Sequence, residues 1–325
     1  MKLIRHIDEL SASDRGGALT MGNFDGVHRG HARIIQRLNH WAAETGGPSI
    51  VFTFDPHPVR LLRPHLAPPP LTWTERKAEL LGQLDVDRVI AWPTDMNLLQ
   101  LSWQEFFSDI IQARFASAAI VEGPNFYFGH NREGNVERLG QLCARSGIEF
   151  EIVPGTRDGE ELISSTRIRE SIAAGDVAAA CRMLTRPYRI RGMVVHGAGR
   201  GAGLGFATAN LDAIDTLIPA FGIYAGLATA RETTRIAAIH IGPSPTFGSQ
   251  RPQVEVHLLG FDDSLYGEVV EVEFLQRLRD VEHYDSVDQL LSQMRQDVEQ
   301  TRAIGESWLA RDQAANDEPT IDQTG

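Results

Sequence analysis

The chain has 325 residues, of which 42% are hydrophobic, and a formal net charge of −12. This length and apolar content suit two globular domains, and the acidic charge argues against a nucleic-acid-binding surface, which is normally basic. No apolar run reaches the roughly 18 residues of a membrane-spanning helix, and the charged N-terminus lacks the apolar core of a secretory signal. We therefore expect a cytoplasmic protein that binds neither a membrane nor nucleic acid.

Two residue types exclude further classes of site. Lys2 and Lys77 are the only lysines, and neither completes the glycine-lysine motif of a P-loop. The two cysteines, Cys143 and Cys181, form neither a CxxC pair nor a disulfide framework. We interpret both as small apolar residues of the core.

The first half alternates strand-like runs with helical patterns. The strand-like runs are residues 18–21, 49–54, 88–92, 118–122 and 149–153. A helix is expected over 28–45, because its apolar residues repeat at helical spacing, and the glycines and proline of 46–48 end it. This alternation predicts a parallel sheet with helices on both faces.

The pattern changes near residue 185. Shorter strand-like runs follow at residues 189–195, 222–229, 236–241, 253–259 and 268–274. Glycine-rich or charged turns separate them, which predicts an antiparallel barrel. A closing helix is expected over 286–303, with Ser286 and Gln289 as its capping box. The polar end of the chain predicts a disordered tail.

A glycine-rich segment joins the first predicted strand to the first predicted helix. In an open parallel sheet, ligands bind beyond the carboxyl ends of the strands, where this segment would lie. His28 and His31 are three residues apart and share a face of the first helical turn, where unpaired amides attract phosphate. Two imidazoles there can donate hydrogen bonds to a transferring phosphoryl group. Zinc ligation and simple exposure are weaker alternatives, because neither explains the adjoining sequence GNFDG.

Residues 163–169, ISSTRIR, form a second candidate for phosphate binding. Ser164, Ser165 and Thr166 are residues that favour a helix N-cap. Arg169 lies one turn later, where it can reach an anionic group such as a leaving pyrophosphate. Taken alone, the segment fits a capped helix with an exposed arginine better.

The second half has its own glycine-rich segment, at residues 196–206. It lacks the GxGxxG spacing followed by a helix, so the dinucleotide fingerprint fails. Its amides could still form a nest around phosphates, although a flexible hairpin is the simpler interpretation of this segment alone. Further on, Glu255 and His257 lie two residues apart on one face of a predicted strand.

These segments together resemble the bacterial bifunctional riboflavin kinase/FAD synthetase family. The resemblance in the first half rests on GNFDGVHRGH (22–31), VFTFDPHP (51–58), NFYFG (125–129) and ISSTRIR (163–169). In the second half it rests on ATAN (207–210), IGPSPTF (241–247) and EVHLL (255–259). It spans roughly residues 15 to 303, and the four segments of the first half are specific in this order.

The resemblance implies two activities on two domains. Residues 1–184 would form a Rossmann-like α/β nucleotidyltransferase domain of the HxGH superfamily. Residues 185–312 would form an antiparallel riboflavin kinase β-barrel with a closing helix, and 313–325 a disordered tail. The barrel would phosphorylate riboflavin to FMN, and the first domain would adenylylate FMN to FAD with release of pyrophosphate. ATP and Mg²⁺ would be required, with riboflavin and FMN as substrates; a weak homo-oligomer stays compatible with the sequence.

The resemblance also assigns residues to the two sites. Its catalytic residues are His28, His31, Arg169 and Glu255, the glutamate acting as general base. The adenylyltransferase ATP site would contain Gly22, Asn23, Phe24, Asp25, Gly26, Asn125, Ser164, Ser165 and Thr166. The flavin side of that site would contain Phe54, Pro56, Pro58 and Phe128. The kinase ATP site would contain Gly197, Gly199, Gly201, Thr208 and Asn210, of which Thr208 and Asn210 would also hold Mg²⁺.

The sequence departs from the family pattern at several positions. Ala207 replaces a proline, His240 an asparagine and Thr185 a glycine of the family's motifs. Ala207 and His240 keep open an adenylyltransferase with a degenerate barrel. A second alternative is a non-catalytic flavin-binding protein, and retention of every expected catalytic side chain argues against it.

Overall fold

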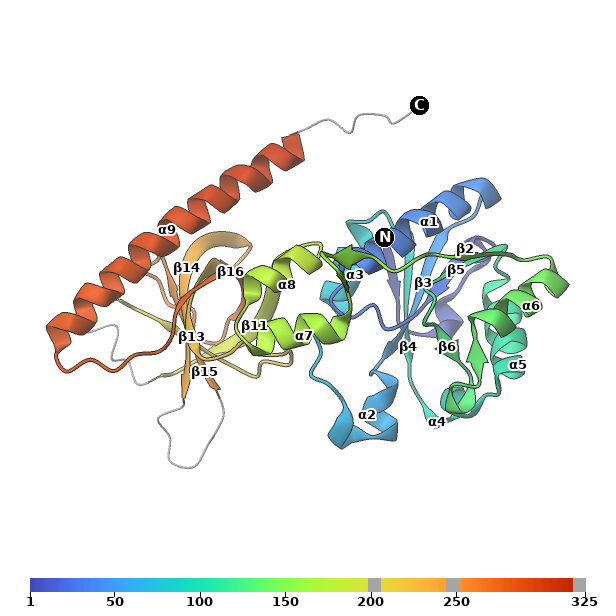
Figure 1. The fold of residues 1–325 in the computed structure, drawn as a ribbon, viewed down its shortest axis with the longest axis horizontal. Coiled ribbons are helices and arrows are strands. Elements are labelled where there is room, and N and C mark those ends of the chain that lie inside the picture. Colours follow the sequence, from blue (N-terminus) through green and yellow to red (C-terminus); the bar gives the residue numbers. More distant parts are fainter. Residues whose placement is uncertain (198–205, 244–251, 318–325) are drawn as a thin grey trace. The chain divides into compact units, whose positions relative to one another are not determined.

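The computed structural model describes residues 1–197, 206–243 and 252–317 and separates the chain into two compact units (Figure 1). One unit contains Met1–Ser165 and Met183–Thr185; the other contains residues 166–182 and the chain from Arg186 onward. Gly199, Gly201, residues 244–247 of the predicted motif and most of the predicted tail lie outside the described residues. Each unit has its own sheet and is described by itself.

A six-stranded parallel sheet organises the first unit, as the sequence predicted. Its strand order is β1-β4-β3-β2-β5-β8. The strands are β1 (Lys2–Ile4), β2 (Ala18–Met21), β3 (Ser49–Asp55), β4 (Arg88–Pro93), β5 (Ala119–Glu122) and β8 (Glu149–Ile152). The edge strand β1 was not expected, because three residues give no readable alternation. It pairs with β4 from Lys2 to Ile4.

Helices cover both faces of this sheet. Neighbouring residues of a strand point to opposite faces, so each strand contributes side chains to both. On one face, α1 (Arg29–Thr45) and α3 (Thr74–Gly82) pack against residues such as Val51 and Val89. On the other, α6 (Val136–Ser146) and a π-helical segment, Phe106–Phe115, enclose Phe52 and Ile50. The central strands β2, β3 and β5 are therefore mostly apolar and buried, which is the pattern of a sheet covered on both sides.

Shorter elements complete this unit. Its remaining helices are α2 (Pro58–Leu62), α4 (Met96–Gln100) and α5 (Trp103–Glu105). Two hairpins pair β6 (Tyr127–Phe128) with β7 (Gly134–Asn135) and β9 (Arg157–Asp158) with β10 (Glu161–Leu162). Short 3-10 turns lie at Ile7–Glu9, Ala12–Asp14, Pro64–Leu66 and His130–Arg132.

The second unit is a closed antiparallel barrel of the predicted class. Its order is β11-β12-β15-β14-β13-β16. The strands are β11 (Tyr188–Val195), β12 (Ala209–Asp212), β13 (Gly222–Ala230), β14 (Thr233–Pro243), β15 (Pro252–Leu258) and β16 (Val269–Arg279). The helices α7 (Ser165–Ala173) and α8 (Val177–Met183) precede it.

The closing helix α9 (Val287–Asp317) is longer than the sequence pattern indicated. The Ser286 hydroxyl accepts a hydrogen bond from the Gln289 amide at 3.3 Å, as expected for the predicted cap. The helix contacts β13, β14 and β16 and then continues beyond residue 303, where the apolar stripe was expected to end. Alanine, glutamate, leucine and arginine in this extension favour the helix intrinsically.

Candidate active sites

The first candidate site lies where β2 and β5 separate. The two strands pair only at Ala18 and Leu19. Beyond that point the buried Glu122 carboxylate accepts a hydrogen bond from the Met21 amide at 2.7 Å and so replaces a strand partner. Burial raises the pKa of Glu122 well above its ordinary value. The loop that follows β2 therefore opens at the type of sheet position where α/β proteins bind ligands.

This loop has strained backbone geometry. Phe24 and Val27 have φ values of 46° and 41°, and Gly26 one of 83°. A positive φ is unusual for a β-branched residue such as Val27 and persists only where the surroundings enforce it. Here the Val27 carbonyl accepts a hydrogen bond from the Thr185 hydroxyl at 2.9 Å. Strain of this kind is concentrated at functional sites.

His28 and His31 meet in the first turn of α1, as the sequence predicted. His28 is the N-cap, and its Nδ1 accepts the His31 amide at 3.2 Å. His31 returns the contact, since its Nδ1 accepts the His28 amide at 3.3 Å. The two rings are stacked, with centroids 3.6 Å apart. With both Nδ1 atoms occupied, each neutral ring carries its proton on Nε2 and can donate it to a ligand.

The protonation of the pair follows from its burial. Burial lowers the pKa of His28 to about 4. Burial also lowers the pKa of His31 well below its usual value, and the neighbouring charges of His28 and Lys77 act in the same direction. Both rings are therefore neutral donors near pH 7, and the site does not rely on imidazolium charge.

Lys77 supplies a positive charge near this pair, and the sequence analysis missed it. Its side chain comes from α3, is only 8% exposed, and its Nζ donates to the Thr53 hydroxyl at 3.3 Å. Burial lowers the pKa of Lys77, while the carboxylates of Asp25 and Asp55 act to raise it. The one signal in the sequence was the scarcity of lysine. The chain has only two lysines, and one of them is buried.

The Asp25 carboxylate holds the loop against a neighbouring segment. It accepts hydrogen bonds from the Leu71 amide, the Thr72 amide and the Thr72 hydroxyl, each at 3.0 Å. Gly26 lies so close to the same segment that a Cβ there would come within 2.9 Å of Leu71. The Asp25 carbonyl also accepts the Ser165 hydroxyl at 2.9 Å. These contacts give Asp25 and Ser165 an anchoring role in the loop.

The remaining residues expected to bind ATP occupy varied positions. The Asn23 Oδ1 atom is buried without a hydrogen-bond partner among the described residues. Gly22 lies beside the Phe24 ring, Asn125 is exposed, and Ser164 immediately precedes α7. Thr166 and Arg169 lie on α7 within the second unit, and their part in the ATP site stays a prediction.

The residues expected on the flavin side divide into two groups. Phe54 is partly buried and Pro56 is exposed at the end of β3, and Pro58 begins α2. Phe128 instead belongs to the core, where it is 6% exposed and stacks on Phe126 with centroids 5.6 Å apart. A contact between Phe128 and flavin stays a prediction.

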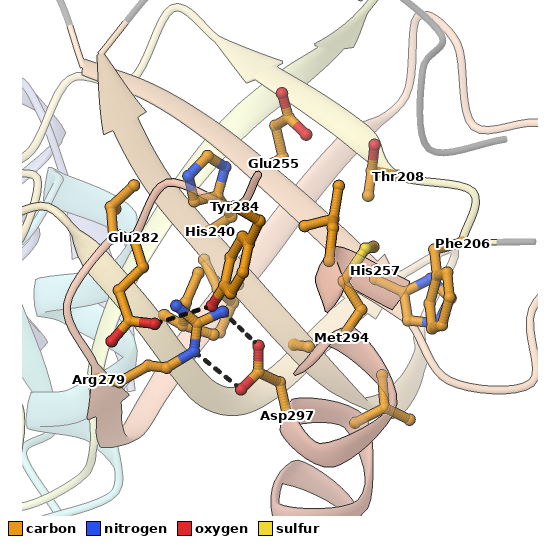
Figure 2. A pocket seen from close by; sticks show the side chains of 16 residues that line it. Phe206, Thr208, His240, Glu255, His257, Arg279, Glu282, Tyr284, Met294 and Asp297 are labelled. Atoms are coloured by element: carbon orange, nitrogen blue, oxygen red, sulfur yellow. Dashed lines mark hydrogen bonds and ion pairs between the residues drawn. The ribbon is translucent and has the colours of Figure 1, made fainter. Parts of the chain in front are cut away.

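The second candidate site is a cavity between the barrel and α9, which we term the α9 cavity (Figure 2). Apolar side chains from strands and helix line one part of it: Ile223, Ile239, Leu290, Met294 and Val298. Glu255, His257 and Thr208 provide polar atoms at its edge, and Figure 2 shows Glu255 and Thr208 on the side away from the helix. An apolar pocket with a few polar groups is typical of a site for an aromatic small molecule.

An ion pair fastens α9 to this cavity. The Arg279 guanidinium donates to both carboxylate oxygens of Asp297, at 3.0 and 2.7 Å (Figure 2). Asp297 is 5% exposed, and Gln293 donates to the same carboxylate at 3.0 Å. A bidentate pair with so little exposure fixes the helix more firmly than a surface pair could.

A neighbouring cavity, which we term the β12 cavity, lies on the other side of Thr208. Thr208 lines both cavities, whereas Asn210 lines only this one. A Cβ at Gly197 would lie 2.1 Å from the Asn210 amide nitrogen, so only glycine leaves room for that side chain. The Tyr266 ring stacks on His196 with centroids 3.9 Å apart and lines the same cavity. Two separate cavities thus share Thr208 as a lining residue.

Asn210 and Glu255 are direct neighbours across β12 and β15, and His240 lies opposite Glu255 on β14. Gln253 connects two of them, because its amide nitrogen donates to Asn210 Oδ1 at 2.6 Å and to Glu255 Oε1 at 3.0 Å. Burial lowers the pKa of His240, and the Glu255 carboxylate acts to raise it. The sequence analysis did not single out Gln253, since its role depends on strand register.

Comparisons with known proteins agree with this arrangement. A family model for FAD synthetase matches residues 10–167, and one for riboflavin kinase matches residues 184–305. The bifunctional riboflavin kinase/FMN adenylyltransferase of Escherichia coli K12 is 35% identical over 302 residues, covering 91% of this chain and 96% of the relative. The chain belongs to the bifunctional riboflavin kinase/FMN adenylyltransferase family. The Pseudomonas fluorescens member is 34% identical and covers 94% of this chain and 98% of its own.

A solved structure is also similar to this chain in its fold. A Streptococcus pneumoniae protein described as a macrolide-efflux protein has a TM-score of 0.82 and 31% sequence identity. The match covers 93% of this chain and 98% of that protein, and so includes both units. Within the described ranges, no helix combines the length and apolar character needed to cross a membrane.

Proposed function

We propose that this chain makes FAD from riboflavin in two steps, one in each unit. The barrel transfers the γ-phosphate of ATP to riboflavin, and the α/β unit then joins the resulting FMN to the adenylyl group of a second ATP. Residues 1–184 and 185–312 would divide the two activities between them. The observation that supports the proposal is a separate candidate site in each unit: the stacked histidine pair, and the two cavities that Thr208 lines.

Adenylyl transfer requires charge stabilisation at the α-phosphate more than covalent chemistry. An oxygen of the FMN phosphate attacks the α-phosphorus of ATP, and the bond from that phosphorus to the bridging oxygen breaks, releasing pyrophosphate. His28 and His31 would donate from Nε2 to oxygens that gain charge, at the N-terminal end of α1. The Lys77 ammonium adds positive potential below the loop. Arg169 would bind the pyrophosphate.

Riboflavin phosphorylation fits the junction of the two cavities. The tricyclic ring would enter the apolar α9 cavity, and ATP the β12 cavity, so that the 5′-hydroxyl and the γ-phosphate meet near Thr208. The Glu255 carboxylate would accept the hydroxyl proton while the oxygen attacks the γ-phosphorus, and ADP would leave. This places the base on the flavin side and Asn210 on the nucleotide side.

The residues around Asn210 suit a magnesium ion. Thr208 and Asn210 offer a hydroxyl and an amide oxygen, which are the hard donors that Mg²⁺ prefers. Residues 1–197, 206–243 and 252–317 contain no cluster of three or more His, Cys, Asp or Glu side chains that could hold a metal. Phosphates and water would supply further ligands to the ion. When bound, it would offset negative charge on the phosphates.

A time course with the purified chain tests this function. Riboflavin, ATP and Mg²⁺ are incubated with the protein, flavins are separated by chromatography, and the reaction is repeated from FMN. We expect FMN and then FAD from riboflavin, and FAD alone from FMN. Formation of FAD from FMN but no turnover of riboflavin would remove the kinase half of the proposal.

A further inference from the structure

Gln253 stands between the two groups that the proposed kinase reaction needs. Its amide nitrogen has two hydrogens, and two acceptors lie within hydrogen-bond distance of it, Asn210 Oδ1 at 2.6 Å and Glu255 Oε1 at 3.0 Å. One acceptor lines the β12 cavity and the other the α9 cavity. A single side chain therefore connects the nucleotide side of the site to the flavin side.

Strand register explains why Gln253 can reach both residues. Gln253 and Glu255 are two residues apart on β15 and share a face, and Asn210 is the direct partner of Glu255 on β12. On the opposite side, Gly242 of β14 is the partner of Gln253. Gly242 has no side chain to compete for the Gln253 amide, and a Cβ there would lie 2.7 Å from His240 Nε2.

The chemistry of an amide suits this position. A hydrogen bond to Asn210 Oδ1 fixes which end of that amide is the oxygen, so the oxygen keeps its second lone pair for a cation. A hydrogen bond to Glu255 orients the carboxylate without adding a positive charge beside it. An arginine or lysine here would instead form an ion pair, which favours the ionised carboxylate and opposes its acceptance of a proton.

We propose that Gln253 is a positioning residue for riboflavin phosphorylation, holding the magnesium-side Asn210 and the general base Glu255 in one arrangement. This inference rests on the proposed kinase function. Residues that orient a metal ligand from behind typically contribute ~10- to 100-fold to metal affinity or activity. Gln253 would have an effect of this size through both Asn210, on the magnesium side, and Glu255, the general base.

The test compares Gln253→Met with wild type in the full-length protein. Methionine fills similar space but cannot donate to either acceptor. Gln276→Met is the matched control, because Gln276 is exposed on β16 and lines neither the α9 nor the β12 cavity. Each protein is assayed for riboflavin phosphorylation, for riboflavin binding by fluorescence quenching, and for FAD formation from FMN. A fourth measurement titrates Mn²⁺ with ADP and riboflavin present, following free Mn²⁺ by electron paramagnetic resonance.

For Gln253→Met we expect kcat of phosphorylation to fall ~10- to 100-fold and Mn²⁺ binding to weaken. Riboflavin binding and FAD formation from FMN should match those of wild type and Gln276→Met. Unchanged kcat and unchanged Mn²⁺ binding would overturn the inference. So would a loss of riboflavin binding in step with kcat, which would make Gln253 a structural residue. If wild type itself fails to phosphorylate riboflavin, the proposed function fails, and the Mn²⁺ titration still tests the link to Asn210.

Discussion

The two sites hold their reactive groups in different ways. In the α/β unit, His28 and His31 are fixed by each other's backbone amides within one helical turn. In the barrel, Asn210 and Gln253 are 43 residues apart, on paired strands, and a side-chain hydrogen bond joins them. The first site is therefore a local structure that one segment specifies, whereas the second depends on the pairing of distant strands. Substitutions should separate the two activities cleanly.

Among the substitutions, Glu255→Gln is expected to separate the two activities most. Without the base, riboflavin phosphorylation should fall by ~10²- to 10⁴-fold, while FAD formation from supplied FMN stays at the wild-type rate. Initial rates from riboflavin and from FMN, measured on one preparation, check this. Glu299→Gln, at an exposed position of α9, is the control and should leave both rates unchanged. A parallel fall in both rates would make Glu255 a structural residue.

His28→Ala should have the opposite effect. Loss of one donor to the transferring group should reduce FAD formation from FMN by ~10²- to 10³-fold, with riboflavin phosphorylation retained. His40→Ala, at an exposed position of the same helix, is the matched control. An undiminished rate of FAD formation in His28→Ala would remove the histidine from the mechanism.

Asp297→Ala tests how far the barrel site depends on side-chain links. The substitution leaves the Arg279 guanidinium, 18% exposed, without its carboxylate, so the second unit should lose ~3 kcal/mol of stability. Riboflavin should bind more weakly, because α9 forms one wall of its cavity. Trp308 is the only tryptophan after residue 103, so the difference in fluorescence between proteins with Trp308 and with Trp308→Phe reports denaturation of this unit.

The control for this experiment is a surface ion pair. Arg231 and Asp263 are 49% and 71% exposed, and exposed pairs contribute little. Asp263→Ala should therefore leave the denaturation curve unchanged. Equal effects of Asp297→Ala and Asp263→Ala would contradict the anchoring role of the Arg279–Asp297 pair.

The neutral state of His28 gives the smallest expected effect, a dependence of stability on pH. The folded pKa of about 4 lies below the ordinary value of 6.5, so the unfolded chain takes up a proton first as pH falls. The associated stability is present above pH 6.5 and is lost as pH falls toward 4. Between pH 7 and pH 5 the loss due to His28 is ~2 kcal/mol.

Chemical denaturation in a Trp308→Phe background measures this loss, because the four remaining tryptophans all belong to the α/β unit. The same protein carrying His28→Gln should lose ~2 kcal/mol less between the two pH values. Equal losses with and without His28 would contradict a buried neutral imidazole.

Sequence reasoning recovered the parts of the molecule that are locally encoded. The β2 strand, the histidine turn and five of the six barrel strands follow from short-range patterns. The strand that was missed, β12, has only four residues and is stabilised by pairing with β11 and β15. The ATAN segment, in which Thr208 and Asn210 were expected to bind ATP and Mg²⁺, runs into this strand and places Asn210 across from Glu255.

The unpredicted parts of the sites depend on contacts over long sequence separations. Lys77 sits on a helix that shows an ordinary apolar pattern, and its burial beside Thr53 appears only when α3 packs on the sheet. Gln253 has no distinctive neighbours in the sequence. Its two hydrogen bonds require the register of β12 against β15, which composition and periodicity do not encode.

A mixing experiment with two variants tests the central claim most directly. Glu255→Gln and His28→Ala proteins are each incubated with riboflavin, ATP and Mg²⁺, alone and together, and FAD is measured by chromatography. The account predicts that each variant alone forms FAD from riboflavin at least ~100-fold more slowly than wild type, with His28→Ala accumulating FMN. The mixture should form FAD far faster than either variant alone, because FMN made on one chain is used by the other. A rate near wild type for either variant alone, or no gain in the mixture, would contradict two separate sites acting in sequence.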